Sequence, residues 1–435
     1  MVDFDDAPRA FSKVLIETLG SEEARAGRIV RDIYGRLSFV TPHPRDERFE
    51  GLRDAAAQTL GAYGQPKTQL IVSISTEESG ARDLFEERSI GVPVDSQPEL
   101  RMVDRRLAGD EWLMRPMQID YDSEPRRLLF YSIKGGVGRS TALAIAAADL
   151  AAQGRNVLAL DLDLEGPGLG ALLLTPEEMP KYGATDWFAA VAAGAETESI
   201  IADMTGPSPF TSARAIVDVV PAAGRDPRMY LSKLARAYTP GSAGEKYRGD
   251  GFVKKADALI TRLASYQRYD AILIDARSGL HETSGGLILG LGAKSLLFGV
   301  DTPQTFDDLR LLFAAFAQAF DPALDGEDLR SAFKMVHAKA PRDEKDRRLF
   351  RERSWEIWSD YLYDDVDPIV ELFGNAFVFD LNEEDAPHFP LEIIGEEAYA
   401  RFDPQTETYP MSAEAYKPVF GNFLDGVKSI LRLTS

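Results

Sequence analysis

The sequence predicts an α/β protein with a doubly wound, mainly parallel sheet, preceded by a small α+β domain. A glycine-rich turn joins an apolar strand to an alanine-rich helix within residues 128–143, and two later apolar strands deliver Asp161 and Asp275. Strand and helix patterns then alternate, which is typical of a parallel sheet covered by helices. We therefore expect a small α+β N-terminal domain at residues 1–120 and the α/β domain, with a C-terminal extension, at residues 121–435.

Composition limits the class of protein. The 435 residues include 44% apolar and 27% charged side chains, as in a globular protein with one large or two medium domains. The absence of cysteine excludes disulfides, thiolate metal sites and thiol catalysis. A formal net charge of −21 gives no strong signal for nucleic-acid binding, which depends on a basic surface. Because no signal-peptide pattern and no run of about 18 apolar residues is present, a cytoplasmic protein is the simplest expectation.

The N-terminal domain contains no motif with a chemical role. Apolar periodicity predicts helices over residues 10–19 and 49–62, and strands over residues 28–40 and 69–75. Residues 90–125 mix prolines with charged side chains and predict a linker that partly packs on the next domain. These patterns give the domain a fold class and no function.

The segment 128–143 organises the rest of the chain. Glycine at positions 135, 136 and 138 allows a tight turn whose N–H groups can point at phosphate oxygens beside a helix N-terminus. The Ser140 hydroxyl then stands where phosphate-binding loops place a Mg²⁺ ligand. The residues expected to hold phosphate are Gly135, Gly136, Val137, Gly138, Arg139, Ser140 and Thr141.

Two downstream strands deliver carboxylates to the same expected edge. Alternation puts Asp161 and Asp163 on one face at the exit of the strand that starts near residue 156, and ligands bind at that edge of open α/β sheets. A pair of strand-end carboxylates that caps the next turn is the alternative. The apolar strand that ends in Asp275 delivers a further carboxylate for Mg²⁺. Arg277, just after it, is either a charge stabiliser or a member of a structural ion pair.

The remaining elements follow from the same periodicities. Helices are expected over residues 141–153, 252–266 and 304–320, and strands over 294–300, 333–337 and 377–381.

Two C-terminal helical patterns leave alternatives open. Residues 342–365 place Trp355, Trp358 and Leu362 at helical spacing, either as a core stripe beneath a charged face or as part of a lid or partner-binding helix. Residues 416–433 have an apolar helical face that favours core packing over contact with a membrane.

The segment Lys134-Gly-Gly-Val-Gly-Arg139-Ser140-Thr141 resembles the deviant Walker A motif of the ParA/MinD-like ATPases, within the SIMIBI group of P-loop proteins. The usual motif is KGGxGK[ST], so Arg139 is a departure, and the chain looks like the KGGVGR variant branch. The resemblance covers roughly residues 126–340. It implies ATP as the ligand, with Mg²⁺ near Ser140, Asp161 and Asp275.

The same resemblance implies roles for three further positions. Lys134 would compensate charge on the nucleotide of a partner subunit, Arg139 would hold the β- and γ-phosphates, and Asp163 would position the attacking water. These roles imply a homodimer with the nucleotides sandwiched between subunits, slow hydrolysis, and a switch that acts on a protein partner. No Asn follows the strand at 333–337, so the motif by which related ATPases read adenine is absent.

Arg139 leaves a second class of function open. Arginine keeps the charge of lysine but presents a planar fork on a longer stem. The alternative is therefore a nucleotide-sensing interaction module that does not hydrolyse, in line with an association of KGGVGR variants with bacterial conflict or defence systems. The related tyrosine-kinase branch is disfavoured, because the last residues contain no tyrosine cluster.

Overall fold

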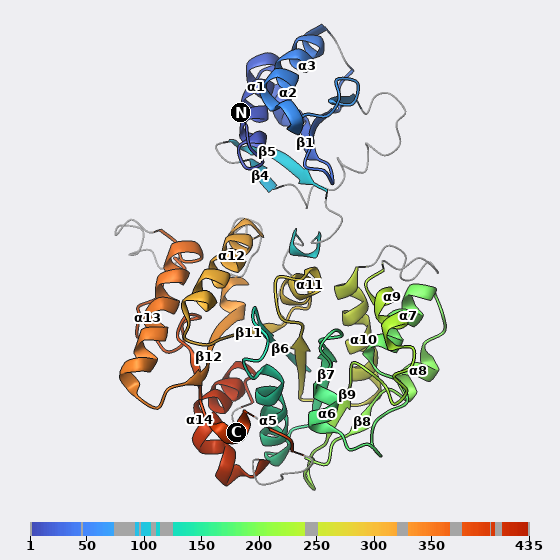
Figure 1. Cartoon of the computed structure of the whole chain (residues 1–435), viewed down its shortest axis with the longest axis vertical. Coiled ribbons are helices and arrows are strands. Elements are labelled where there is room, and N and C mark those ends of the chain that lie inside the picture. Colours follow the sequence, from blue (N-terminus) through green and yellow to red (C-terminus); the bar gives the residue numbers. More distant parts are fainter. Residues whose placement is uncertain are drawn as a thin grey trace. The chain divides into compact units, whose positions relative to one another are not determined.

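The chain divides into two compact units, Met1–Arg115 and Pro116–Ser435, which we describe one at a time (Figure 1). In the structure, a computed structural model, the described residues are 2–44, 47–73, 92–94, 97–105, 110–113, 125–239, 251–319, 329–365, 376–400, 402–404 and 411–433.

The first unit is an α+β fold with a five-stranded sheet in the order β3-β2-β1-β5-β4. Its elements are α1 (Ala7–Leu19), α2 (Ser21–Ala26), β1 (Arg28–Arg31), β2 (Leu37–Thr41), α3 (Glu47–Leu60), the 3-10 turn η1 (Gly61–Tyr63), β3 (Ile71–Ser73), β4 (Val92–Val94), β5 (Gln97–Asp104) and the 3-10 turn η2 (Asp110–Leu113). The core lies between α1, α3 and the sheet, where Phe11, Phe39, Phe49 and Leu52 are buried. Burial of these apolar side chains stabilises the unit.

Two expectations for this unit are wrong. The predicted single strand over 28–40 is an antiparallel hairpin, because the Asp32 carboxylate accepts hydrogen bonds from the N–H groups of Tyr34 and Arg36 while Gly35 takes a φ of 81°. Such side-chain bonds to the following backbone stabilise turns. Part of the predicted linker over 90–125 is also structured, since β5 pairs with β1 inside the sheet.

The second unit is built on an eight-stranded sheet in the order β13-β12-β11-β6-β10-β7-β9-β8. All neighbouring strands are parallel except β8 and β9. The strands are β6 (Arg126–Ser132), β7 (Val157–Leu162), β8 (Gly206–Pro207), β9 (Val217–Val220), β10 (Ala271–Ala276), β11 (Lys294–Gly299), β12 (Phe333–Ala340) and β13 (Leu391–Ile394). The predicted mainly parallel α/β architecture is therefore confirmed.

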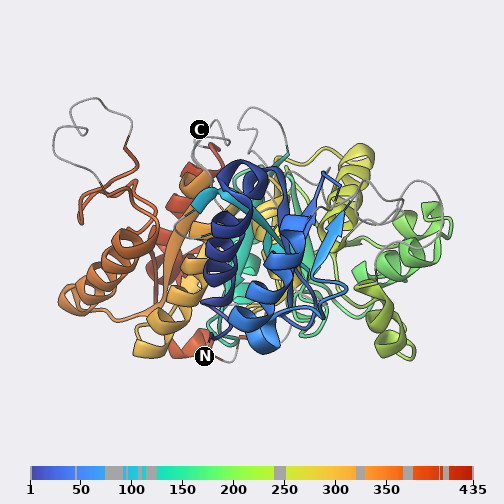
Figure 2. The same ribbon diagram turned by 90° about the horizontal axis from the view of Figure 1, so that it is seen from above.

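Helices of several turns connect most of these strands. They are α5 (Arg139–Ala152), α6 (Leu169–Leu173), α7 (Ala184–Ala193), α8 (Glu198–Ala202), α9 (Tyr230–Ala237), α10 (Phe252–Tyr266), α11 (Glu282–Gly290), α12 (Pro303–Ala319), α13 (Glu344–Tyr361) and α14 (Ala413–Ile430), with 3-10 turns η3 (Leu329–Ala332) and η5 (Glu397–Tyr399). Two views of the second unit agree that α13 and the group α7 to α9 lie at opposite ends of it (Figures 1 and 2). The site described below lies on the strands between these ends.

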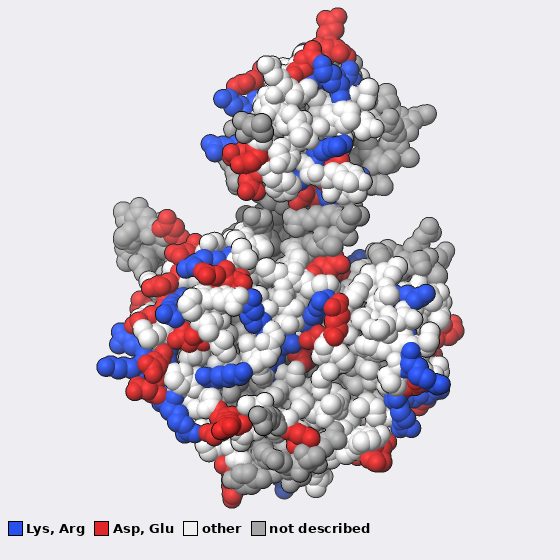
Figure 3. Space-filling model, in the orientation of Figure 1, with Lys and Arg blue, Asp and Glu red and all other residues white. Residues whose placement is uncertain are grey.

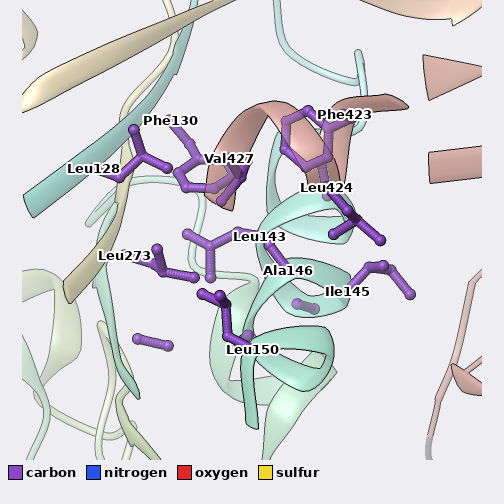
Figure 4. Close-up of a cluster of buried hydrophobic side chains, with 14 of the residues drawn as sticks. Leu128, Phe130, Leu143, Ile145, Ala146, Leu150, Leu273, Phe423, Leu424 and Val427 are labelled. Carbon is purple, nitrogen blue, oxygen red and sulfur yellow. The ribbon is translucent and has the colours of Figure 1, made fainter. Parts of the chain in front are cut away.

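Helices α5 and α14 pack side by side on one face of the sheet. Leu143 and Leu150 of α5 and Phe423 and Val427 of α14 belong to one buried cluster with Phe130 of β6 (Figure 4). The apolar face predicted at 416–433 is thus part of the core. Among the described helices, none combines the length and the apolar character needed to cross a membrane.

The aromatic stripe of α13 is also a core feature. Trp358 is fully buried, and Trp355 donates a hydrogen bond to the carbonyl of Phe379 at 2.9 Å. The strand predicted over 377–381 is wrong. Phe377 and Phe379 sit in an irregular segment, where their rings pack on Tyr363 at centroid distances of 5.7 and 5.6 Å. These tilted ring contacts explain why the segment is apolar without being paired in the sheet.

Candidate nucleotide-binding site

The site lies at the carboxyl end of β6, where the direction of the strand order switches: after β6 the chain passes β10 to form β7, and after β10 it passes β6 to form β11. β6 is flanked by β10 on one side and β11 on the other, and β7 lies beyond β10. Asp161 of β7 and Asp275 of β10 are direct neighbours in the parallel register. Ligands of open α/β sheets bind at the carboxyl ends of the strands, at such a topological switch point. The fold therefore places both carboxylates beside the loop that follows β6.

The loop has the backbone of a phosphate cradle. Gly136 has a φ of 74° and Gly138, at the N-cap of α5, has a φ of 100°. A Cβ at either position would meet no atom within 4 Å, so the left-handed backbone, and not a lack of space, requires glycine. Within the described part of the chain, the N–H groups from Gly135 to Ser140 donate no hydrogen bond to protein. N–H groups without a protein acceptor at a helix N-terminus suit an anion.

Arg139 is buried and held by two carboxylates. Its side chain is 8% exposed, and Nη2 lies 3.0 Å from Asp163 Oδ2 while Nε lies 3.4 Å from Asp275 Oδ1. Across the described residues, Nη1 is buried without a hydrogen-bond partner. A phosphate oxygen would satisfy that donor, because buried polar groups otherwise retain the cost of lost hydration.

Asp275 also accepts a hydrogen bond from the Ser140 hydroxyl. Burial raises the pKa of Asp275, and the Arg139 guanidinium and the Ser140 hydroxyl oppose that shift. The second carboxylate oxygen, Oδ1, has no hydrogen-bond partner among the described residues. A hydroxyl and a carboxylate are hard oxygen donors of the kind Mg²⁺ prefers, and Mg²⁺ usually completes its shell with water and phosphate. Ser140 and Asp275 therefore fit the ion.

Asp161 acts as a cap for the next turn. Its carboxylate accepts hydrogen bonds from the N–H groups of Asp163, Gly168 and Leu169, each at 3.1 Å. Burial, followed by the charge of Asp275, raises its pKa, and the N–H donors of Leu169 and Gly168 oppose the shift. The capping alternative is thus realised in this structure, and a role for Asp161 near Mg²⁺ stays a prediction. Within the described ranges, no group of three or more His, Asp or Glu side chains is arranged to hold a metal ion.

Two further basic side chains near the loop form ion pairs with acidic residues. Lys134 is 44% exposed and pairs with Asp308 of α12, with 3.0 Å between Nζ and Oδ2. Arg277 pairs with Glu165 at 2.5 Å, which joins the turn after β10 to the turn after β7. The ion-pair alternative for Arg277 is therefore the arrangement observed.

Three contacting residues were missed by the sequence analysis. Asp308, Glu165 and Lys339 each touch the loop or its neighbouring turns, and Lys339 donates from Nζ to the carbonyl of Gly136 at 2.8 Å. Lys339 lies in strand β12, near the sheet edge where ligands bind. Its position in that strand is the only feature of the sequence that could have indicated a role at the site. Asp308 lies inside a helix without any motif around it.

A parallel sheet with a glycine-rich loop at its switch point, followed by a helix and flanked by strand-end aspartates, is the arrangement typical of P-loop NTPase domains. Residues 125–205 match a ParA family model that is described as NUBPL iron-transfer P-loop NTPase. This match confirms the predicted resemblance to the ParA/MinD-like P-loop NTPases for the segment that contains the loop. A comparison with curated proteins found no match.

Solved structures with a similar fold include MinD from Pyrococcus horikoshii OT3 complexed with Mg-ADP, which is 19% identical, with 71% of this chain and 98% of that chain covered and a TM-score of 0.41. A putative plasmid partition protein from Borrelia burgdorferi B31 bound to AMPPNP is 16% identical, with coverages of 71% and 100% and a TM-score of 0.42. The pNOB8 ParA bound to nonspecific DNA is 16% identical, with coverages of 71% and 97% and a TM-score of 0.41.

Proposed function

We propose that the second unit binds Mg-ATP and acts as a slowly hydrolysing, nucleotide-dependent dimeric switch for a protein partner. The observation that supports this best is the loop itself, whose N–H groups from Gly135 to Ser140 have no protein acceptor within the described residues. They lie beside a hydroxyl and a carboxylate suited to Mg²⁺. ATP, in place of another nucleotide, follows from the resemblance of the loop to the ParA/MinD-like motif.

Each side chain of the site has a part in this proposal. The N–H groups of the loop bind the phosphates, and Ser140 with Asp275 would hold the ion. Bound Mg²⁺ supplies charge neutralisation at the phosphates. Arg139 donates to the β- and γ-phosphates once its guanidinium turns from Asp163, and Asp163 then becomes an acceptor that can orient water.

The proposal of a dimer rests on the position of Lys134. Its side chain is exposed beside the loop and its partner in this subunit is the half-buried Asp308. In the proposed dimer the ammonium leaves Asp308 and binds the nucleotide of the other subunit. A protein is the partner class that we favour, because basic and acidic side chains are interspersed over the face drawn in Figure 3 and the net charge is −21.

One observation favours a second function, a sensor that binds nucleotide and does not hydrolyse it. The guanidinium of Arg139 engages both Asp163 and Asp275. Its fork spans two carboxylates at once, which the single ammonium of lysine does less well. A fork that kept Asp163 occupied after nucleotide binding would leave no acceptor for the attacking water.

Calorimetric titration with ATP, ADP and GTP in the presence of Mg²⁺, with phosphate release measured on the same samples, distinguishes these functions. The switch predicts ATP binding, steady phosphate release that falls in Lys134→Ala, and a nucleotide-dependent dimer in light scattering. Nucleotide binding by a wild-type protein that releases phosphate no faster than Lys134→Ala would support the sensor. If the protein bound none of the three nucleotides, both proposals would be wrong.

A further inference from the structure

Strand β12 contains an unusual backbone residue next to the phosphate-binding loop. Among the described residues, only Lys339 and Arg432 combine a side chain with a positive φ, and the φ of Lys339 is 54°. This conformation is unfavourable for a residue with a Cβ, so it persists only where surrounding contacts maintain it. The register of β12 against β13 shifts between His337 and Ala340, at the same place.

Gly395, the residue after β13, contacts this kink. The N–H of Gly395 donates to the carbonyl of Ala340 at 2.8 Å, and a Cβ on Gly395 would stand 3.3 Å from the carbonyl oxygen of Lys339. The close approach of the residue after β13 therefore favours a glycine. At this kink, Nζ of Lys339 donates a hydrogen bond to the carbonyl of Gly136 at 2.8 Å. Within the described ranges, Lys339 forms no ion pair with any carboxylate.

The contact determines how one peptide of the loop is oriented. In a trans peptide the C=O and the following N–H point in opposite directions. A donor that holds the Gly136 carbonyl on one side therefore directs the N–H of Val137 to the other side. The anchor matters here because Gly136 and Gly138, with φ of 74° and 100°, have backbones that glycine leaves free to rotate.

We propose that Lys339 is a positioning residue of the phosphate-binding loop, which holds the Gly136 carbonyl so that the Val137 N–H stays directed at the phosphate. This inference rests on the proposed nucleotide binding and names a group that no motif of the loop contains. The ligand chemistry is a di- or triphosphate, and the nucleoside part is not involved.

Two variants separate the ammonium from the backbone strain. Lys339→Met keeps a long unbranched side chain and removes the donor, whereas Lys339→Gly removes the donor and also relieves the positive φ. Lys294→Met is the matched control, because Lys294 is another strand lysine that donates to a backbone carbonyl, that of Ser331 at 2.6 Å. It pairs in register with Leu128, near the beginning of β6 and away from the loop.

The first measurement is calorimetric titration of the full chain with Mg-ADP and with Mg-tripolyphosphate. Both Lys339 variants are expected to bind both ligands about 10-fold more weakly, the size expected for one hydrogen bond from a charged donor. Lys339→Gly should show this loss while its unfolding midpoint stays equal or rises. Lys294→Met should bind like the wild type.

The second measurement is the amide resonance of Val137 in protein labelled with ¹⁵N-valine, recorded without ligand. It should move in both Lys339 variants and stay in place in Lys294→Met. Wild-type affinity in both Lys339 variants, or a loss for Mg-ADP with none for tripolyphosphate, would overturn the inference alone. No binding of either ligand by the wild type would overturn the proposed function together with it.

Discussion

Replacement of Arg139 by methionine tests whether the site depends on a buried cation. The change keeps a long side chain and leaves Asp163 and Asp275, which are 12% and 2% exposed, without their shared partner. Removing one member of a buried ion pair costs about 3–5 kcal/mol, because the remaining charge is neither solvated nor paired. With a denaturant dependence of about 3 kcal/mol/M, the urea midpoint should fall by about 1–2 M at pH 8 without nucleotide.

Tryptophan fluorescence is a suitable readout, since Trp187 and Trp358 are fully buried in the second unit. Arg310→Met is the matched control. Arg310 is 51% exposed and its pair with Asp307 is on the surface, so its loss should cost about 1 kcal/mol or less.

The pH dependence gives this prediction its sharpest test. Burial raises the pKa of Asp275 and Arg139 opposes that shift, so the pKa rises further in Arg139→Met. When folding raises the pKa of a carboxyl, the native state keeps the proton at pH values where the unfolded chain has already lost it. The contribution of that carboxyl to stability is therefore present at low pH and is lost as the pH rises through the folded-state pKa. The deficit of Arg139→Met should therefore shrink markedly between pH 8 and pH 5. A deficit of equal size at both pH values, or none at pH 8, would show that Arg139 is not the charge partner of these carboxylates.

Two further predictions follow from the contacts of the second unit. Asp308→Asn removes the partner that holds Lys134 in its own subunit, so dimers should form at an ATP concentration a few-fold lower, as measured by sedimentation velocity. The effect is small because Lys134 is 44% exposed and such ion pairs are worth about 1 kcal/mol or less. An unchanged or higher concentration would show that Asp308 does not restrain Lys134. Phe423→Ala leaves a cavity beside Phe130 and Phe298, whose rings lie 6.2 and 5.9 Å away, and should lower the free energy of unfolding by about 3–5 kcal/mol. A loss below about 1 kcal/mol would contradict a core role for α14.

The elements that the sequence predicted correctly are those that physical periodicity specifies strongly. β7 and β10 are apolar except for an aspartate as the last residue but one, and α10 has the predicted bounds Phe252–Tyr266. The errors fall where the local pattern is ambiguous. The hairpin turn at Asp32 interrupts a run of strand-forming residues, and β5 contains a proline and charges that are also typical of linkers. The sequence alone predicts neither the position of this turn nor the pairing of β5 with β1, because strand preference depends on which strand is the neighbour in the sheet.

The candidate site also contains a part that the sequence predicts and a part that it does not. The loop and its carboxylates could be predicted because one contiguous motif and two strand ends specify them. The contacts from Asp308 to Lys134 and from Lys339 to Gly136 join positions about 170 and 203 residues apart, and no local pattern marks them. Contacts of this kind depend on the order of the strands. The sequence indicates that β11 and β12 exist and does not state on which side of β6 they lie.

The two cations that the family motif assigns to phosphate both have carboxylate partners in this chain. Arg139 lies between Asp163 and Asp275, and Lys134 binds Asp308. If nucleotide binds as proposed, its phosphates replace these carboxylates as partners of the two cations. That exchange is favourable only where the phosphates bring more negative charge than the carboxylates they replace. In the proposed complex the loop N–H groups, one of which Lys339 orients through the Gly136 carbonyl, add donors that no carboxylate uses, so they would select a polyanion over a single carboxylate. Under the proposed function, the site would discriminate by phosphate charge, and the two ion pairs of Arg139 would set how much of that charge is needed.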